Sequence, residues 1–179
     1  NKESEDVHDL LDNLLKWTKS QTGRLTVVRQ DLDLNDIIPG VVDIFEMIAQ
    51  NKHIKLNYQT SASSVIVTAD NDMLKTVVRN FMSNAIKFTP ENGSIDIILS
   101  TEGDYAKVSV RDHGVGIAPE RLSSIFNKGE TTYGTGGEEG SGLRLQLCQD
   151  FATKNGGSCT VESVLGEGST FSVLVPLKK

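Results

Sequence analysis

Residues 70–90, with the sequence DNDMLKTVVRNFMSNAIKFTP, constrain this chain more than any other stretch. Apolar residues recur there at helical spacing and form one face of a predicted helix. These apolar residues are Leu74, Val77, Val78, Phe81, Met82 and Ala85. Asp70 is suited to cap the start of the helix, and Pro90 ends it. The pattern therefore predicts a helix that packs one face against a core.

The other face of this predicted helix is unusual. Asn80, Asn84 and Lys87 follow one another at four and three residues, so they share one stripe. Asn prefers helix caps to helix interiors, which makes two carboxamides an unfavourable choice here. Carboxamide oxygens can ligate a hard cation such as Mg²⁺, and a Lys ammonium can bind phosphate oxygens. Taken by itself, the stripe is more simply interpreted as a solvated polar face, but later stretches of the sequence favour a binding site.

Composition limits the class of protein. A chain of 179 residues that is 37% hydrophobic suits one globular domain with a small appendage. The net charge of -6, without a basic stripe, argues against nucleic acid as a partner. Cys148 and Cys159 lack metal-ligand spacing and lie in apolar patterns, so we expect reduced core thiols.

Membrane-spanning and targeting segments have recognisable sequence patterns. No run is long and apolar enough to span a bilayer, and no signal peptide is visible, so we expect no membrane contact by this chain. The first residue is not Met, and we therefore expect an excised fragment whose membrane anchor, if one exists, lies outside it.

Periodicity and turn residues predict the order of the elements. Helices are expected over residues 1–21, 33–51, 70–89, 118–125 and 143–154. Strands are expected over residues 54–58, 64–68, 93–100, 105–111, 158–163 and 169–174, after an extended piece at 24–28. The turn at Glu102, Gly103 and Asp104 predicts a hairpin. The glycine-rich loop at 126–142 is long enough to be either disordered or a functional lid.

Asp112 occupies an unexpected position. Ala106, Val108 and Val110 face one side of the predicted strand, and Asp112 continues that apolar side at its end. A buried carboxylate is costly unless a hydrogen-bond donor accompanies it. Asp112 is therefore a candidate binding residue, the alternative being an ordinary turn residue before the glycines that follow.

Four motifs occur in a fixed order along the chain. They are RNFMSNAIKFTP at 79–90, DHGVGI at 112–117, IFNKGETT at 125–132 and GSGLRL at 140–145. This series resembles the N box, first glycine box, F box and second glycine box of the ATP-binding catalytic domain of sensor histidine kinases. That family shares its fold with gyrase, heat-shock protein 90 and the mismatch-repair ATPases. The resemblance covers residues 33–176.

The resemblance implies a fold and a division of the chain. The expected fold is an α/β two-layer sandwich of the Bergerat type, with a mixed sheet of about five strands covered on one face by three helices, plus an N-terminal helix. Residues 1–28 would be the end of the second dimerisation-stem helix with a linker, because KWTKSQTGRL at 16–25 resembles that segment. Residues 29–179 would be the ATP-binding domain. His8 lacks the family's acceptor context, so it is not assigned as the phosphoacceptor.

The resemblance also implies roles for the polar stripe. Asn84 would supply an oxygen to Mg²⁺, with Asn80 beside it, and Lys87 would reach the phosphates. Asn80 and Lys87 would be the catalytic residues, acting by positioning and charge neutralisation, since phosphoryl transfer needs little covalent chemistry from the protein.

Further residues would contact the nucleotide. Asp112 would accept a hydrogen bond from the adenine amino group, and Gly114 and Gly116 would let the backbone approach the base. The helix that begins at Gly142 can hold phosphate on its N-terminal N–H groups. The remaining expected contacts are Phe88, Ile117, Phe126, Thr132, Gly140, Ser141, Leu143 and Arg144.

Two residues depart from the family pattern. Asn80 stands where the hydrolytic relatives place a Glu that activates water, and a carboxamide cannot take a proton. This favours transfer to a protein nucleophile over rapid ATP hydrolysis. Arg144 replaces a glycine of the usual GxGLGL. Its guanidinium could bind a phosphate or crowd the site, which leaves the nucleotide affinity open.

The expected function is that of an ATP-dependent protein histidine kinase. It would transfer the γ-phosphoryl group of ATP to a histidine on a dimerisation domain outside this chain, so the fragment would not phosphorylate itself. The full-length protein is expected to be a homodimeric, membrane-anchored sensor, of which this chain is a cytoplasmic part. A response-regulator receiver domain is its second expected partner.

Three other functions remain open. The first is a degenerate nucleotide-sensing or interaction module without kinase activity, with Arg144 as its signature. The second is a related serine kinase that restrains a sigma factor, against which the stem-like residues 17–25 argue. The third is a hydrolytic ATPase, against which Asn80 argues.

Overall fold

The computed structural model describes residues 26–122 and 142–179, together with residues 11, 15, 16, 18, 19 and 22. The helices of this part are α2 (Leu34–Asn51), α3 (Asn71–Phe88), α4 (Pro119–Leu122) and α5 (Gly142–Lys154). The strands are β1 (Arg29–Asp33), β2 (Lys55–Thr60), β3 (Ile66–Asp70), β4 (Ser94–Glu102), β5 (Tyr105–Asp112), β6 (Ser158–Val164) and β7 (Gly168–Pro176).

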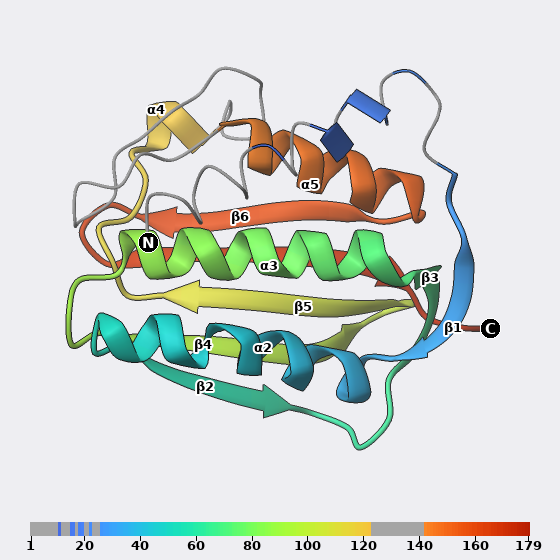
Figure 1. Ribbon diagram of the computed structural model, residues 1–179, viewed down its shortest axis with the longest axis horizontal. Helices are drawn as coiled ribbons and strands as arrows, with labels where there is room; N and C mark the ends of the chain where they lie inside the picture. Colours follow the sequence, from blue (N-terminus) through green and yellow to red (C-terminus); the bar gives the residue numbers. More distant parts are fainter. Residues whose placement is uncertain (1–10, 12–14, 17, 20–21, 23–25, 123–141) are drawn as a thin grey trace.

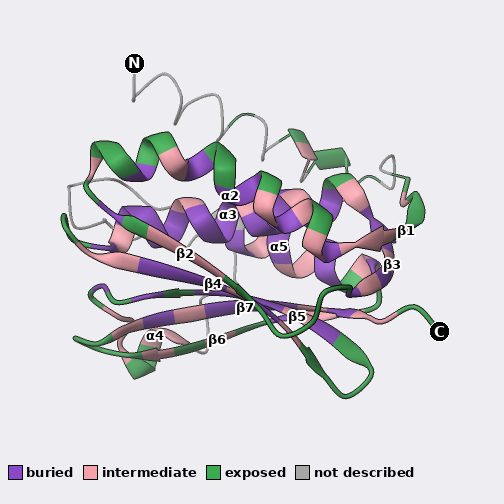
Figure 2. Cartoon of the chain, turned by 90° about the horizontal axis from the view of Figure 1, so that it is seen from below, coloured by how far each residue is buried: buried purple, intermediate pink, exposed green. Residues whose placement is uncertain are grey.

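The main sheet has five strands in the order β2-β4-β5-β7-β6. The β2–β4 pair is parallel and the other pairs are antiparallel, so the sheet is mixed. Helices α2, α3 and α5 cover one face of it (Figure 2), and the short α4 packs against β6. The predicted two-layer α/β sandwich with about five strands and three covering helices is confirmed.

The core lies between α3 and the sheet. Alternate residues of β4 point toward the helices, and Ile95, Ile97 and Leu99 are all 0% exposed, as expected for a strand with one buried face. Phe81, on the apolar face of α3, is also 0% exposed, and its ring centroid lies 5.5 Å from that of Phe171 on β7. The apolar spacing in residues 70–90 therefore predicted the core-facing side of α3 correctly.

Two strands form a separate small sheet. β1 and β3 pair antiparallel with each other, while β2 joins the main sheet beside β4. The sequence predicted an extended piece at 24–28, but the strand begins at Arg29, and its pattern RQDLD has no apolar alternation. Backbone pairing with β3, rather than side-chain burial, therefore determines where β1 lies.

Parts of two predictions lie outside the described residues. Of the helix expected over residues 1–21, the described residues Leu11, Leu15, Lys16, Thr18 and Lys19 are helical. The loop expected over 126–142 is described only at Gly142, where α5 begins. Within the described residues, no helix has both the length and the apolar character needed to cross a membrane.

Other expectations are confirmed in detail. The predicted hairpin closes with Glu102 opposite Tyr105, and Gly103 has a positive φ of 61° in its turn. Cys148 and Cys159 are buried free thiols, and the Cys159 Sγ donates to the Cys148 carbonyl oxygen at 3.4 Å.

Three chain segments have ends toward the same side of the molecule. Helix α3 and strand β5 both end at the left of Figure 1, and α5 begins at its own left-hand end, above α3. Strands β1 and β3 lie at the opposite end, where α3 begins (Figure 1). The fold therefore brings the end of the polar stripe, Asp112 and the start of α5 to the same side.

Candidate functional site

The polar stripe of α3 is buried. Asn80, Asn84 and Lys87 are 6%, 4% and 7% exposed, so the interpretation of a solvated polar face is wrong. The helix that carries them starts firmly, because the Asp70 Oδ1 accepts a hydrogen bond from the Met73 N–H at 3.0 Å. Two carboxamides and one ammonium group are thus held on a fixed helix, away from bulk water.

Asn84 is the least satisfied member of this stripe. Within the described part of the chain its side chain makes no hydrogen bond, although the residue is only 4% exposed. Its carboxamide atoms are not among the fully buried side-chain atoms that lack a partner, so the carboxamide keeps some contact with solvent. The Asn84 carboxamide is therefore a group that a ligand or its water could satisfy.

Asp112 is a buried carboxylate with one oxygen occupied. It lies at the end of β5, 4% exposed, and its Oδ1 accepts from the Gly114 N–H at 2.9 Å and the Ser169 N–H at 3.2 Å. None of the described residues donates to Oδ2. Burial raises the pKa of Asp112, while the two backbone hydrogen bonds oppose that rise. The fold thus fixes one oxygen and leaves the other for a donor.

The sequence pointed to Asp112 as a candidate binding residue but did not indicate its contact with Ser169. Ser169 is distant along the chain, and it reaches the carboxylate because β7 pairs with β5 in the sheet. Its hydroxyl also lies 2.8 Å from that of Ser163 on β6. We find no signal in the sequence that would have revealed this contact, because it depends on the strand register.

The glycines after Asp112 allow close packing of backbone. A side chain at Gly114 would collide with the carbonyl group of Phe88, at the end of α3. Gly116 has a positive φ of 73°, and a side chain there would collide with the Val164 carbonyl oxygen. The turn is therefore wedged between α3 and the β6–β7 turn, which is a structural requirement in addition to the predicted approach of a base.

Ile117 is tied to the same turn. Its N–H donates to the Ser163 Oγ at 2.8 Å, and its side chain packs half-buried against the core. Phe88 is also half-buried, at the last position of α3.

The remaining predicted contacts are only partly described. Gly142 begins α5 on the same side of the molecule as the end of α3 (Figure 1). The side chains of Leu143 and Arg144 lie outside the described part, although their backbone is helical. Phe126, Thr132, Gly140 and Ser141 also lie outside the described residues. The roles of these residues stay predictions.

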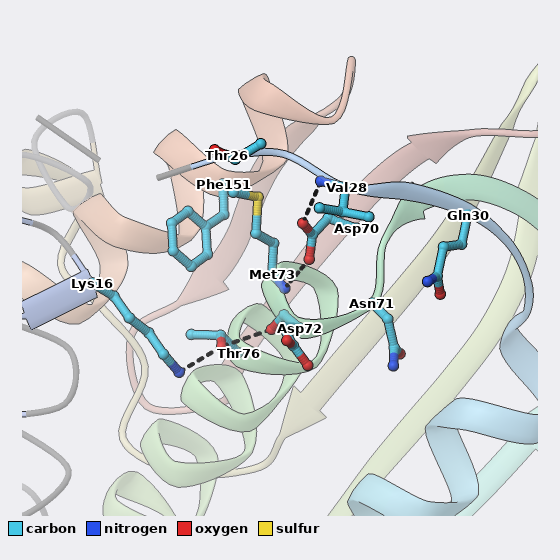
Figure 3. Close-up of a pocket in the computed structure, with 10 residues that line it drawn as sticks. All are labelled: Lys16, Thr26, Val28, Gln30, Asp70, Asn71, Asp72, Met73, Thr76 and Phe151. Atoms are coloured by element: carbon cyan, nitrogen blue, oxygen red, sulfur yellow. Dashed lines mark hydrogen bonds between the residues drawn. The ribbon is translucent and has the colours of Figure 1, made fainter. Parts of the chain in front are cut away.

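A separate cavity of about 360 Å³ lies at the other end of α3, lined by Lys16, Thr26, Val28, Gln30, residues 70–73, Thr76 and Phe151 (Figure 3). The Asp70 Oδ2 accepts from the Val28 N–H there at 2.8 Å, and the Lys16 Nζ donates to the Thr76 Oγ1 at 3.0 Å. Since none of the predicted nucleotide residues lines this cavity, we interpret it as the place where the segment before β1 packs against the start of α3.

The chain is similar in sequence to a known protein family. Residues 69–179 match the family model described as "Histidine kinase-, DNA gyrase B-, and HSP90-like ATPase". Sensor histidine kinase RppB of Synechocystis is 33% identical over 94% of this chain and 36% of its own length. Histidine protein kinase DivJ of Caulobacter vibrioides is 31% identical over 94% of this chain and 28% of its own. The chain thus spans about a third of these relatives.

Solved structures of histidine kinases are similar to this chain in fold. The nucleotide-free catalytic domain of histidine kinase ThkA is 29% identical, with a TM-score of 0.73 over 83% of this chain and 97% of that domain. Full-length ShkA in complex with AMPPNP is 25% identical, with a TM-score of 0.82 over 99% of this chain and 37% of ShkA. Both are similar in fold to the whole of the described α/β domain.

Proposed function

This chain belongs to the family of histidine kinase-, DNA gyrase B- and HSP90-like ATPases, as an ATP-binding catalytic domain of the sensor histidine kinase type, and from this premise we propose a reaction and a site. The domain binds ATP between α3, Asp112 and the start of α5. It then transfers the γ-phosphoryl group to a histidine on a dimerisation domain outside this chain.

The observation that carries the proposal is the half-satisfied carboxylate of Asp112. Its Oδ1 is held by two backbone N–H groups, and Oδ2, which accepts no hydrogen bond from the described residues, is the oxygen that we propose for the ligand. The exocyclic amino group of adenine is a donor of the required kind. A charge-assisted hydrogen bond in a buried site gives both affinity and selection for adenine over bases that present a carbonyl there.

The buried carboxamide of Asn84 supports a site for Mg²⁺. Mg²⁺ binds through oxygen, keeps several of its waters, and takes few protein ligands beside substrate phosphates. One carboxamide oxygen with no competing hydrogen bond in the described chain suits that ligand set, and Asn80 lies one turn away. The ion would neutralise phosphate charge during transfer, and Lys87 would do the same from its ammonium group.

Asn80 supports transfer over hydrolysis. The hydrolytic relatives use a carboxylate to take a proton from water, and a carboxamide has no basic site for this step. A histidine acceptor supplies its own nucleophilic nitrogen, so the reaction does not depend on a base at residue 80. Positioning and charge neutralisation by α3 would be sufficient.

The partners follow from the same proposal. The acceptor histidine belongs to a dimerisation domain, and we propose residues 1–28 as the end of its stem and residues 29–179 as the catalytic domain. We propose that the whole protein is a homodimeric cytoplasmic kinase that phosphorylates a response-regulator receiver domain. In support, a ThkA complex with response regulator protein TrrA is 25% identical to this chain, with a TM-score of 0.80.

Calorimetry tests the site. A non-hydrolysable ATP analogue is titrated into the chain with and without Mg²⁺, and we expect saturable binding that strengthens with Mg²⁺. Asn84→Ala should lose most of the Mg²⁺ effect while Asp43→Ala, an exposed residue of α2, should behave as wild type. No binding at millimolar analogue would refute the proposal and favour the degenerate module, for which Arg144 is the motivating residue.

A phosphotransfer assay tests the reaction. The full-length protein, which carries the acceptor, is incubated with ATP labelled at the γ-phosphate. We expect acid-labile, base-stable label on the protein, as a phosphohistidine gives. Rapid release of inorganic phosphate without labelled protein would instead support the hydrolytic ATPase.

A further inference from the structure

Helix α3 ends in a way that leaves a carbonyl without its usual donor. Residue 90 would donate to the Ile86 carbonyl oxygen if the helix continued, but Pro90 has no N–H. The chain instead becomes extended at Thr89, with φ -89° and ψ 128°, and the Thr89 N–H closes the helix on the Ala85 oxygen at 3.0 Å. A donor from elsewhere is needed to satisfy the last turn.

Lys52 supplies that donor. Its Nζ donates to the Ile86 oxygen at 2.9 Å and to the Lys87 oxygen at 3.2 Å. Lys52 is itself the C-cap residue of α2, where its own N–H donates to the Ala49 oxygen. One half-buried lysine therefore joins the ends of two helices, and its positive charge meets the partial negative charge at the end of α3.

The next carbonyl group of the same turn, that of Phe88, is contacted by the glycine segment. Gly114 packs directly on the Phe88 carbonyl group, and no side chain could fit between them. Lys52 thus holds the carbonyl groups of Ile86 and Lys87, and Gly114 packs against the carbonyl group of Phe88. Lys87 and Phe88, whose side chains are proposed to meet the nucleotide, are carried by this clamped turn.

We infer that Lys52 is a positioning residue for nucleotide binding, which acts by fixing the backbone of Lys87 through the two carbonyl oxygens. This inference rests on the proposed function, since it assigns Lys52 a role at that same site. Lys52 itself need not touch the nucleotide. Loss of its ammonium group would let the last turn of α3 move, and a small displacement of a binding group has a large effect on affinity.

Removing Lys52 would also lower stability if the residue were only a structural cap. The effect on nucleotide affinity must therefore be separated from the effect on folding. A double-mutant cycle with Lys52→Met and Lys87→Met does this in calorimetric titrations of the Mg²⁺-loaded ATP analogue, performed well below the melting temperatures. If Lys52 acts through Lys87, its replacement should raise the Kd about tenfold in wild type but less than about twofold in the Lys87→Met background. A general loosening of the fold would give the same factor in both backgrounds.

Two controls complete the experiment. Lys55→Met removes an exposed lysine three residues along the chain, and it should leave the Kd unchanged. Lys52→Arg keeps the charge and several donors, and it should restore the Kd to within about threefold of wild type. If Lys52→Met does not fold, the same cycle is run with the neutral, shorter Lys52→Gln.

The outcomes separate the two proposals. Wild-type binding with a non-additive cycle supports the inference. Wild-type binding with equal effects in both backgrounds, or an unchanged Kd in Lys52→Met, refutes the inference and leaves the proposed function intact. Absence of wild-type binding refutes the proposed function, and with it any role of Lys52 in binding.

Discussion

Asp112→Asn is the sharpest perturbation of the proposed site. The two backbone donors, Gly114 and Ser169, both need an acceptor at the position of Oδ1, so the new amide must place its oxygen there. Its NH₂ group then takes the place of Oδ2 and faces the adenine amino group, donor against donor. The substitution changes one atom of the side chain but reverses the hydrogen-bonding character of the free position.

The size of the effect follows from the bond that is lost. A hydrogen bond to a charged group contributes about 1.5–3 kcal/mol, so we expect the Kd of the ATP analogue to rise about 10- to 150-fold. Isothermal titration calorimetry in Mg²⁺ buffer measures this directly. An unchanged Kd would refute the assignment of Asp112 as the adenine acceptor.

Asp112→Asn should weaken nucleotide binding without lowering the stability of the fold. Burial raises the pKa of Asp112 above its ordinary value of 3.8, so the folded state is penalised for carrying the charge once the pH exceeds the raised pKa. Asp112→Asn removes that charge and keeps the acceptor for Gly114 and Ser169. We expect an equal or higher melting temperature at neutral pH, with the advantage fading as the pH falls toward 3.8. A large loss of stability at neutral pH would contradict this.

Asp96→Asn is the matched control, because Asp96 lies on β4 beside Asp112 but on the opposite face of the sheet. Burial pushes the pKa of Asp96 up, yet hydrogen bonds from Arg111, Asn57 and His113 bring it below its ordinary value. The variant should therefore lose stability at neutral pH and keep its nucleotide affinity within about twofold.

Three further predictions concern other parts of the fold. Gly114→Ala should lower the unfolding free energy by at least about 2 kcal/mol in urea titrations, because its methyl group would collide with the backbone of Phe88, whereas Gly40→Ala has open space. Asp70→Ala should lower the unfolding free energy by about 1–3 kcal/mol, since it removes both the cap of α3 and the acceptor of the Val28 N–H; a change near zero would contradict that. The stabilisation that the Asp96 carboxylate gives the wild type should be present at neutral pH and lost as the pH falls through its lowered pKa. Equal melting temperatures of the wild type and Asp96→Asn at every pH would exclude this stabilisation.

The sequence was sufficient for the local structure of the central helix. Its apolar spacing, an N-cap at Asp70 and a stop at Pro90 each act within a few residues, so they could be read without knowing the fold. The same applies to the alternation of β4 and β5 and to the tight hairpin between them. The ordered motifs predicted the sandwich because they identified a family whose architecture is shared.

Other features depended on long-range pairing. The sequence predicted strands at 54–58 and 64–68 but contained no sign that β2 would join the main sheet while β3 would pair with β1. β1 itself was not predicted as a strand, because its residues are polar and mostly exposed. Such pairings are decided by which backbone edges remain open once the core has formed, and no short pattern encodes that.

The sequence by itself singled out the candidate residues for the proposed chemistry, namely the stripe of Asn80, Asn84 and Lys87 and the carboxylate of Asp112. Only the tertiary structure decided that the stripe is buried, that Ser169 holds one oxygen of Asp112, and that Lys52 closes the end of α3. The reason is physical. Residue type and spacing set what a side chain can do, but burial and the remaining hydrogen-bond partners are fixed by segments far away in the chain.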